Sequence, residues 1–498
     1  MSMDSLKRSL EDRESTQTSK KQHVESKSSV NTSLSTKLFQ QIPRVKKTHK
    51  TKYLKDNVFG DLSMSAQIRN CVDKPEFQRL RRILQLGLTH FIYPPATHTR
   101  FQHCAQSGHW TEKFVLHLKA NQPELLINDR IVFLLTLSGW WHDICHTLFS
   151  HSFDHHIAKP QGIPDHEERI GPLIRYMNKK YPDLTLSKEE EDLVIAVIQG
   201  NPIQGYPEWM FQIVANHQSE LDTDKLAYES LDSANIGLPV NLQIERIIRE
   251  ARVVDNQICY RNDDSTYSIL FTVFITRYNL FKMVYRHHAV VAIETMMKHA
   301  LLSLDCVMKW KQTFLSPDMK WLNLTDELLH HLYLLPRDNL SSMELKSLEQ
   351  AEYLIKRIET NRDIYFIEQL VLMNGKRTCE QDILETLQSS CHFVCNHCHE
   401  TVQLDELLKE SEEKHSPEAE FKIPSHELCK TTLGLSGAPM INPMNKVWFY
   451  NERLSADGKT IIYEKFTRQI REFSQVFAEI KTSEIVFYLI CTKSKNSS

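Results

Sequence analysis

The stretch Gly139-Trp-Trp-His142-Asp143-Ile-Cys-His146-Thr-Leu-Phe-Ser-His151 decides the fold. It closes the longest apolar run of the chain, residues 131–141, which predicts a buried helix that ends where the polar residues begin. An ionised Asp beside a His in apolar surroundings is costly unless a cation pairs with it, and a metal ion would supply that charge. We expect His146 to lie on the same helical face as His142, four residues earlier. An isolated His-Asp pair, however, is more often a hydrogen-bonded pair packed within a helix.

The numbers of His and Gly are both unusual: the chain has 24 His and only 13 Gly in 498 residues. Average Gly usage is roughly 7%, and the phosphate loop of nucleotide-binding proteins needs two glycines followed by Lys and Ser or Thr. The nearest match, Gly200 to Gly205, is followed by Tyr206 and Pro207, so it is not such a loop. Any phosphate group must therefore be bound by side chains.

Length and composition indicate a soluble globular protein of two or three domains, with 41% hydrophobic and 25% charged residues. No apolar run approaches the 18 or so residues of a transmembrane helix, and no apolar signal segment begins the chain. Eleven Cys without a framework spacing favour free thiols in a reducing compartment. We expect a protein of the nucleus or cytoplasm, or of both, that does not bind membranes.

Three regions are expected along the chain. Residues 1–49 are basic, rich in Ser and Thr and poor in aromatic residues, which predicts a disordered tail. Its pairs Lys7-Arg8 and Lys20-Lys21 are either a two-part nuclear import signal or simply a solvated basic segment. Residues 50–365 predict a mainly α-helical catalytic core, and residues 366–498 a smaller α+β regulatory region.

Periodicity places the main elements. Helices are expected around residues 77–84, 131–138, 187–198, 231 onward, 240–254 and 268–302, with a capping box formed by Ser187 and Glu190. In the last region, strands at 447–450 and 461–463 are expected to form a hairpin through an Asp457-Gly458 turn. A helix face from Phe466 to Ile480 and a strand at 484–492 follow. The fold class is therefore mainly α.

Two further motifs complete an order of His, HD and Asp. His98-Thr-Arg100-Phe-Gln-His103 precedes the opening stretch, and Leu221-Asp222-Thr-Asp224-Lys225 follows it. In this order they resemble the HD superfamily of metal-dependent phosphohydrolases. Segments 73–87, 222–232 and 276–287 are similar to its deoxynucleoside triphosphate triphosphohydrolase branch, above all to the vertebrate SAM-and-HD-domain group. We expect that the SAM domain is absent here and that the basic tail replaces it.

The resemblance implies a divalent metal cofactor and a reaction. The ligands of the metal ion would be His103, His142, Asp143 and Asp224, a set that suits Fe, Mn or Zn, with Mg at an adjacent site. In this branch water attacks the α-phosphorus of a deoxynucleoside triphosphate (dNTP) and releases deoxynucleoside and inorganic triphosphate. The leaving oxygen needs a proton. Besides Asp143, the implied catalytic residues are His166 and His151; either His is a candidate proton donor, and Asp154 could orient either one.

The resemblance also assigns substrate contacts. The cationic residues that bind the triphosphate would be Arg100, Lys225 and Arg277. The sugar would meet Tyr285, Asp232 and Gln85, and the remaining substrate-binding residues implied are Leu86, His146 and Tyr228. Two positions depart from the branch: Phe281 stands where it has a substrate-contacting His, and Arg286 where it has a Gln near the base. Base preference is therefore left open.

Regulation is implied in the same way. The resemblance assigns an activating nucleotide, GTP or dGTP, to Lys52, Asp73, Gln78, Arg81 and Arg261, and it implies a homo-oligomer, either a dimer or a tetramer.

Two other functions compete with this interpretation. One is a different HD phosphohydrolase, such as a phosphodiesterase or nucleotidase. The other is a non-catalytic HD protein that binds nucleic acid through its basic tail. A separate cluster, Cys391-x3-Cys395-x2-Cys398, has only one C-x2-C pair, so reduced thiols are expected rather than a zinc site.

Overall fold

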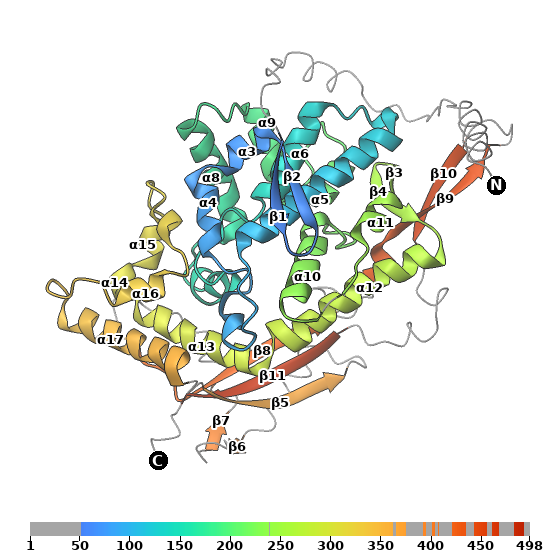
Figure 1. Ribbon diagram of the computed structural model, residues 1–498. Helices are drawn as coiled ribbons and strands as arrows, with labels where there is room; N and C mark the ends of the chain where they lie inside the picture. Colours follow the sequence, from blue (N-terminus) through green and yellow to red (C-terminus); the bar gives the residue numbers. More distant parts are fainter. Residues whose placement is uncertain are drawn as a thin grey trace, which may run out of the picture.

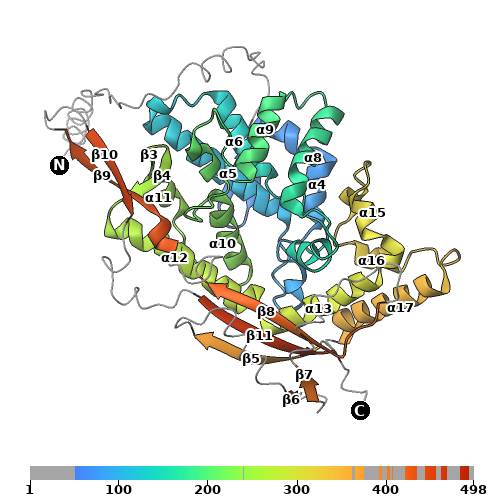
Figure 2. The same ribbon diagram turned by 180° about the vertical axis from the view of Figure 1, so that it is seen from behind.

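The computed structural model describes residues 51–238, 240–361, 365–374, 392–394, 401–403, 407, 421–434, 443–455, 461–467 and 483–492. The basic tail, the Cys391-Cys395-Cys398 cluster and the Asp457-Gly458 turn lie outside the described residues. Within the described part, the predicted fold class is confirmed: helices form a large core, and small sheets lie along its edges (Figure 1; Figure 2). None of the described helices is long and apolar enough to cross a membrane.

The described helices are α3 (Ala66–Val72), α4 (Pro75–Gln78), α5 (Arg100–Asn121), α6 (Asp129–Trp141), α7 (His151–Phe153), α8 (His166–Lys180), α9 (Lys188–Ile198), α10 (Thr223–Asn235), α11 (Ile244–Arg249), α12 (Asp264–Leu280), α13 (His288–Ser303), α14 (Asp305–Met308), α15 (Trp310–Phe314), α16 (Leu328–Leu332) and α17 (Ser342–Lys356). The strands are β1 (Lys52–Asp56), β2 (Gly60–Met64), β3 (Ala251–Val254), β4 (Gln257–Arg261), β5 (Phe366–Asn374), β6 (His392–Val394), β7 (Thr401–Gln403), β8 (His426–Gly434), β9 (Trp448–Leu454), β10 (Ile461–Thr467) and β11 (Ser483–Cys491).

Helices α5 and α6 cross closely at the centre of the core (Figure 1). A Cβ added to Gly108 of α5 would lie 2.2 Å from Cδ1 of Trp140, and one added to Gly139 of α6 would lie 3.2 Å from Cα of Gly108. Only residues without a Cβ permit this approach. The crossing brings His103 of α5 close to His142, which follows α6 directly.

Several predicted elements are confirmed. The apolar run forms α6, whose N-terminus is capped by the side chain of Asn128, which accepts a hydrogen bond from Ile131 N at 2.9 Å. The predicted capping box of Ser187 and Glu190 begins α9. Strands β9 and β10 pair as an antiparallel hairpin, and β11 closes the chain as expected.

Other expectations were wrong. The chain turns after His142, where His146 N bonds to Asp143 O at 3.1 Å, so a turn rather than a helical face places His146. Residues 240–254 form the short α11 and then β3, because Ala251–Val254 pair with β4. Near residue 77 the α-helix ends at Gln78, and a 3₁₀ turn follows it. Phe466 lies in β10 rather than in a helix.

Two sheets attach the C-terminal segments to the helical core. The order β10-β9-β4-β3 joins the hairpin to two strands of the core, through a parallel pairing of Tyr260 with Phe449. The sheet β5-β11-β8 lies along α13 (Figure 1; Figure 2). A domain boundary near residue 366 stays a prediction.

Replacement of Gly108 by Ala should destabilise the fold by about 3 kcal/mol, because the new Cβ overlaps the Trp140 ring. Gly171→Ala in α8 is the matched control, since its Cβ would meet the flexible end of Arg175 and make ordinary contact with Ile195, and the change should stay within about 1 kcal/mol. Urea unfolding of both variants measures the difference. Equal stability of the two would contradict the importance of the helix crossing.

Candidate active site

Four potential metal ligands converge at the crossing of α5 and α6. His103 Nε2 lies 2.9 Å from His142 Nε2, 3.4 Å from Asp143 Oδ2 and 3.0 Å from Asp224 Oδ1. His142 Nε2 lies 3.5 Å from Asp143 Oδ2 and 3.2 Å from Asp224 Oδ1. Atoms bound about 2.1 Å from one ion would be separated by roughly 3.0–3.4 Å in octahedral or tetrahedral geometry. The distances of the two imidazole nitrogens from each other and from each carboxylate therefore suit a single divalent cation, and His103, His142 and Asp143 form the tightest group.

Hydrogen bonding and charge favour this use of the four residues. His142 Nδ1 donates to Gly139 O at 2.9 Å, which leaves its Nε2 lone pair directed at the other donors. Burial alone would lower the pKa of His142, but the carboxylates of Asp143 and Asp224 raise it to about 9. The carboxylates thus attract positive charge to this point. Two imidazoles and two carboxylates form a donor set that suits Fe, Mn or Zn.

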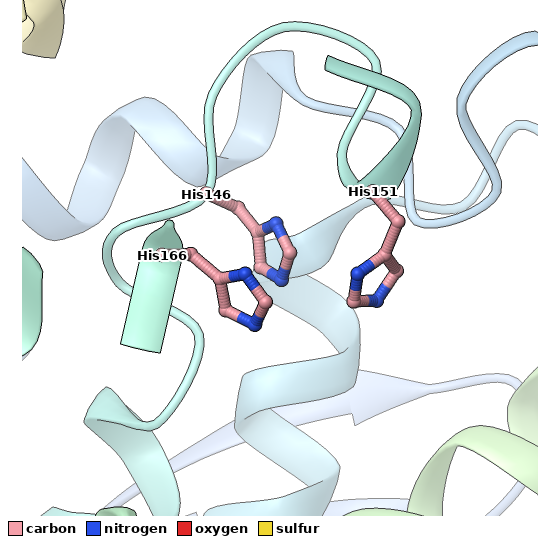
Figure 3. Close-up of side chains that lie close together, drawn as sticks. All are labelled: His146, His151 and His166. Atoms are coloured by element: carbon pink, nitrogen blue, oxygen red, sulfur yellow. The ribbon is translucent and has the colours of Figure 1, made fainter. Parts of the chain in front are cut away.

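Three further histidines face one another beside these donors: His146, His151 and His166 (Figure 3). The His146 and His166 rings stack with centroids 3.9 Å apart, and His151 lies edge-on to both. His146 Nε2 is 3.3 Å from Asp143 Oδ1. Asp143 therefore connects the two groups of side chains, with one oxygen toward each.

His166 has a hydrogen-bonded carboxylate that fixes its orientation. Its Nδ1 lies 2.8 Å from Asp154 Oδ2, and Arg169 Nη2 donates to Asp154 Oδ1 at 3.0 Å. Burial would raise the pKa of Asp154, but the bond to His166 and the charge of Arg169 lower it, so Asp154 stays ionised. An ionised Asp154 keeps the proton of His166 on Nδ1 and leaves Nε2 directed away from it.

His151 differs from His166 in its environment. Its ring is exposed toward the cavity, where partial desolvation and the nearby charges of Arg100 and His166 lower its pKa, which favours the neutral ring. In the structure Asp154 bonds to His166, whereas the sequence left open which of the two histidines Asp154 orients.

Two residues that sequence reasoning missed hold the loop after α6. The buried Arg79 donates to Ile144 O at 3.2 Å and to His146 O at 2.7 Å. Asp326 accepts from Leu84 N at 2.8 Å and from Phe149 N at 2.6 Å. Asp326 is 177 residues from Phe149 in the sequence, so no local pattern could have revealed this contact.

A cavity of about 710 Å³ opens onto the donor atoms and onto His151 and His166, whereas His146 is fully buried behind its wall. Its described lining includes the sequence-predicted residues Gln85, Leu86, Arg100, His103, His142, Asp143, His151, His166, Asp224, Lys225, Tyr228, Asp232 and Tyr285. Gln85 Oε1 is buried and has no hydrogen-bond partner among the described residues, so it can accept a bond from a ligand.

Of the three cationic residues predicted to bind the phosphates, two lie at the cavity. Arg100 pairs with Asp143 and donates to Ser150 Oγ at 3.0 Å, while Lys225 Nζ lies 2.8 Å from Asp222 Oδ2. Both line the cavity. Arg277 instead bonds to Glu229 at 2.8 Å and to Glu220 at 3.1 Å, and it is not among the described residues that line the cavity. Its role in substrate binding stays a prediction.

The predicted sugar contacts form one hydrogen-bonded group. Tyr285 Oη donates to Asp232 Oδ2 at 2.5 Å, and His98 Nε2 lies 2.7 Å from Asp232 Oδ1. His98 was part of a quoted motif but had no assigned role. Phe281, one of the two departures from the resembled branch, lies edge-on to Tyr285 with centroids 5.1 Å apart.

The residues predicted to bind an activator are divided between two places. Arg81 accompanies Asp73 and Gln78: its Nε donates to Gln78 Oε1 at 2.9 Å, and its guanidinium lies 3.4 Å from the Phe101 ring centroid. Arg81 and Phe101 line a second cavity of about 350 Å³, beside β1, which carries Lys52. Arg261 lies apart on β4 and pairs with Glu452 (Figure 1).

The chain is similar to several known proteins, although no family model matches it. It is 30% identical over 339 residues to a "Deoxynucleoside triphosphate triphosphohydrolase SAMHD1 homolog" of Dictyostelium discoideum, covering 67% of this chain and 63% of the relative. It is 29% identical over 288 residues to the human "Deoxynucleoside triphosphate triphosphohydrolase SAMHD1", covering 52% of this chain and 46% of the relative. An HD domain-containing protein of Acanthamoeba polyphaga mimivirus is 24% identical over 471 residues, 88% of this chain and 92% of that protein. The chain thus spans less than two thirds of the two triphosphohydrolases.

Replacement of Asp224 by Ala should lower the metal bound per chain at least about tenfold, because it removes one of the four converging donors. Asp232→Asn is the control, since Asp232 lines the same cavity but is not one of the four donors. Elemental analysis after desalting in limiting Fe, Mn or Zn measures the content. Unchanged metal in Asp224→Ala would contradict the assigned ligands.

Proposed function

Because the chain belongs to the HD-domain family that includes deoxynucleoside triphosphate triphosphohydrolases, we propose that it hydrolyses dNTPs to deoxynucleoside and inorganic triphosphate. The observation that carries this proposal is one cavity that joins the four converging donor atoms, the His166–Asp154 pair and the Tyr285–Asp232 pair. A metal site, a proton donor and a sugar-sized polar contact are the parts that this reaction requires.

Different residues of the cavity contact the triphosphate and the sugar of the substrate. Arg100 and Lys225 offer the cationic groups for the triphosphate. Asp232, with its oxygens fixed by Tyr285 and His98, and the unpartnered Gln85 Oε1 offer acceptors for the 3′-hydroxyl. The Tyr285 ring packs against the sugar and leaves no room for a 2′-hydroxyl.

His166 is the proposed proton donor to the leaving 5′-oxygen. Asp154 holds its ring by Nδ1, so that a proton on Nε2 can be delivered into the cavity. Asp154 also stabilises the charged imidazolium while it carries that proton. His151, which lines the cavity, would serve as a polar contact to the phosphates, whereas the buried His146 would support His166 by ring stacking.

Four residues hold the metal: His103, His142, Asp143 and Asp224. A bound divalent ion would lower the pKa of the attacking water and polarise a phosphoryl oxygen. Fe, Mn or Zn fits this donor set. An adjacent Mg would be held by oxygen atoms, namely the second oxygen of Asp143 together with oxygens of the substrate phosphates.

Regulation and location are proposed on narrower support. The second cavity, with Arg81 over Phe101, is the proposed site for GTP or dGTP as activator. A homo-oligomer would let Arg261 of one subunit reach this cavity in another. Location in the nucleus or cytoplasm, and nucleic-acid binding by the basic tail, rest on the sequence alone.

Incubation of the purified chain with each dNTP, with and without GTP and across a metal series, should yield deoxynucleoside and inorganic triphosphate in equal amounts. Ion chromatography separates triphosphate from pyrophosphate and phosphate. Pyrophosphate or deoxynucleoside monophosphate as the product would instead identify another kind of HD phosphohydrolase.

The variant Asp154→Asn should lower kcat at least about tenfold, with bound metal unchanged, because the amide no longer holds His166 as a proton donor. Asp192→Asn, which removes an exposed carboxylate paired with Arg175, is the matched control and should keep full activity. Steady-state rates at saturating dNTP give kcat. An unaltered kcat in Asp154→Asn would remove His166 from the proposed role.

A further inference from the structure

The wall of the main cavity next to Tyr285 carries a carboxylate and a guanidinium with no role so far. Arg286 directly follows Tyr285, Glu294 lies in α13, and Ser152 lies in α7, and all three line the cavity. Ser152 Oγ donates to Glu294 Oε1 at 2.6 Å. Arg286 Nη1 lies 3.9 Å from Glu294 Oε2.

This arrangement is not a closed ion pair. A separation of 3.9 Å is too long for a hydrogen bond, so Arg286 and Glu294 do not satisfy each other's donors and acceptors. The side chain of Glu294 is 18% exposed and that of Arg286 is 32% exposed, and both residues line the cavity. Burial raises the pKa of Glu294, which shows that its charge is poorly solvated there. Both groups can therefore gain from a ligand that bonds to them.

The position favours a nucleobase over a phosphate. In the proposed binding mode the sugar lies at Tyr285 and the phosphates at Arg100 and Lys225, so the base continues from the sugar on the side opposite to the phosphates. Arg286 is the next residue after Tyr285. A buried carboxylate such as Glu294 would repel a triphosphate, but it accepts N–H groups of a base.

Guanine matches the pair better than the other bases. Its Watson–Crick edge presents two neighbouring N–H donors, N1–H and the exocyclic amine, which a single carboxylate can accept together. Its O6 and N7 are the acceptors that an Arg guanidinium binds in bidentate fashion. Adenine and cytosine each place a ring acceptor beside their amine, which a carboxylate would repel, and thymine offers a single ring N–H.

We propose that Glu294 and Arg286 select guanine, so that dGTP is the preferred substrate of the main cavity. Glu294 accepts N1–H and the exocyclic amine, Arg286 donates to O6 or N7, and Ser152 fixes the carboxylate. The assignment rests on the proposed dNTP hydrolysis, because that function places the sugar and phosphates.

The test compares kcat/KM for dGTP, dITP, dATP, dCTP and dTTP on the full chain, with saturating GTP in every assay so that the second cavity is filled equally. The unaltered chain should prefer dGTP over dATP about ten- to a hundredfold. It should use dITP, which lacks the exocyclic amine, about tenfold less well than dGTP. Equal use of dGTP and dITP, or of all five substrates, overturns the proposal without any variant.

Glu294→Gln keeps the size of the side chain but replaces one acceptor oxygen by a donor. It should lower kcat/KM for dGTP about ten- to a hundredfold and change that for dATP less than about twofold. Arg286→Gln should act in the same selective way. If either variant lowers kcat/KM for all substrates alike, its side chain contacts the triphosphate or only supports the fold, and the guanine assignment fails.

Two measurements separate this inference from the proposed function. Glu349→Gln, an exposed carboxylate of α17, is the matched control, and thermal unfolding of each variant detects a loss of fold. Equilibrium dialysis of dGTP and dATP in EDTA, with saturating GTP to fill the second cavity, needs no hydrolysis: dGTP should bind about tenfold tighter, and Glu294→Gln should abolish this difference. Hydrolysis without guanine preference contradicts only the inference. Absence of hydrolysis contradicts the proposed function, and dialysis still decides the inference.

Discussion

The close crossing of α5 and α6 is the constraint on which the rest of the structure depends. Because Gly108 and Gly139 lack a Cβ, the helices approach until His103 and His142 direct two imidazole nitrogens at one point, 2.9 Å apart. Two carboxylates then reach the same point. Burying such a group of donors is unfavourable unless positive charge joins it, so the packing of the two helices creates a site that could bind a metal ion.

Asp143 transmits this constraint to the rest of the cavity. One of its oxygens faces the other metal donors and the second faces His146, which stacks on His166. The loop that carries Asp143 and His146 has no regular structure of its own. Arg79 and Asp326 hold it through its backbone groups, so elements distant in the sequence fix the positions of these two side chains.

The sequence predicts the parts of this site that local patterns encode. The apolar run predicts α6 and its end, and the family resemblance that the motifs carry implies the four donors. It fails where tertiary contacts decide. Continued helical geometry was expected for His146, but the chain turns there. Residues 251–254 carry helical periodicity yet form β3, because β4 pairs with them. No spacing in the sequence reports such partners.

The abundance of histidine illustrates the same point at the level of single atoms. His142 donates from Nδ1 to a backbone carbonyl and directs Nε2 at the metal donors, whereas Nδ1 of His166 bonds to Asp154 and its Nε2 is left for proton transfer. His98 instead fixes Asp232 beside the proposed sugar site. His299 bonds to Glu427 at 3.0 Å and attaches α13 to β8. Histidine therefore has four different roles in this structure. In each case the partner of a ring nitrogen decides which role the residue has. Because that partner comes from a distant segment, a count of histidines can locate the site but cannot assign the residues within it.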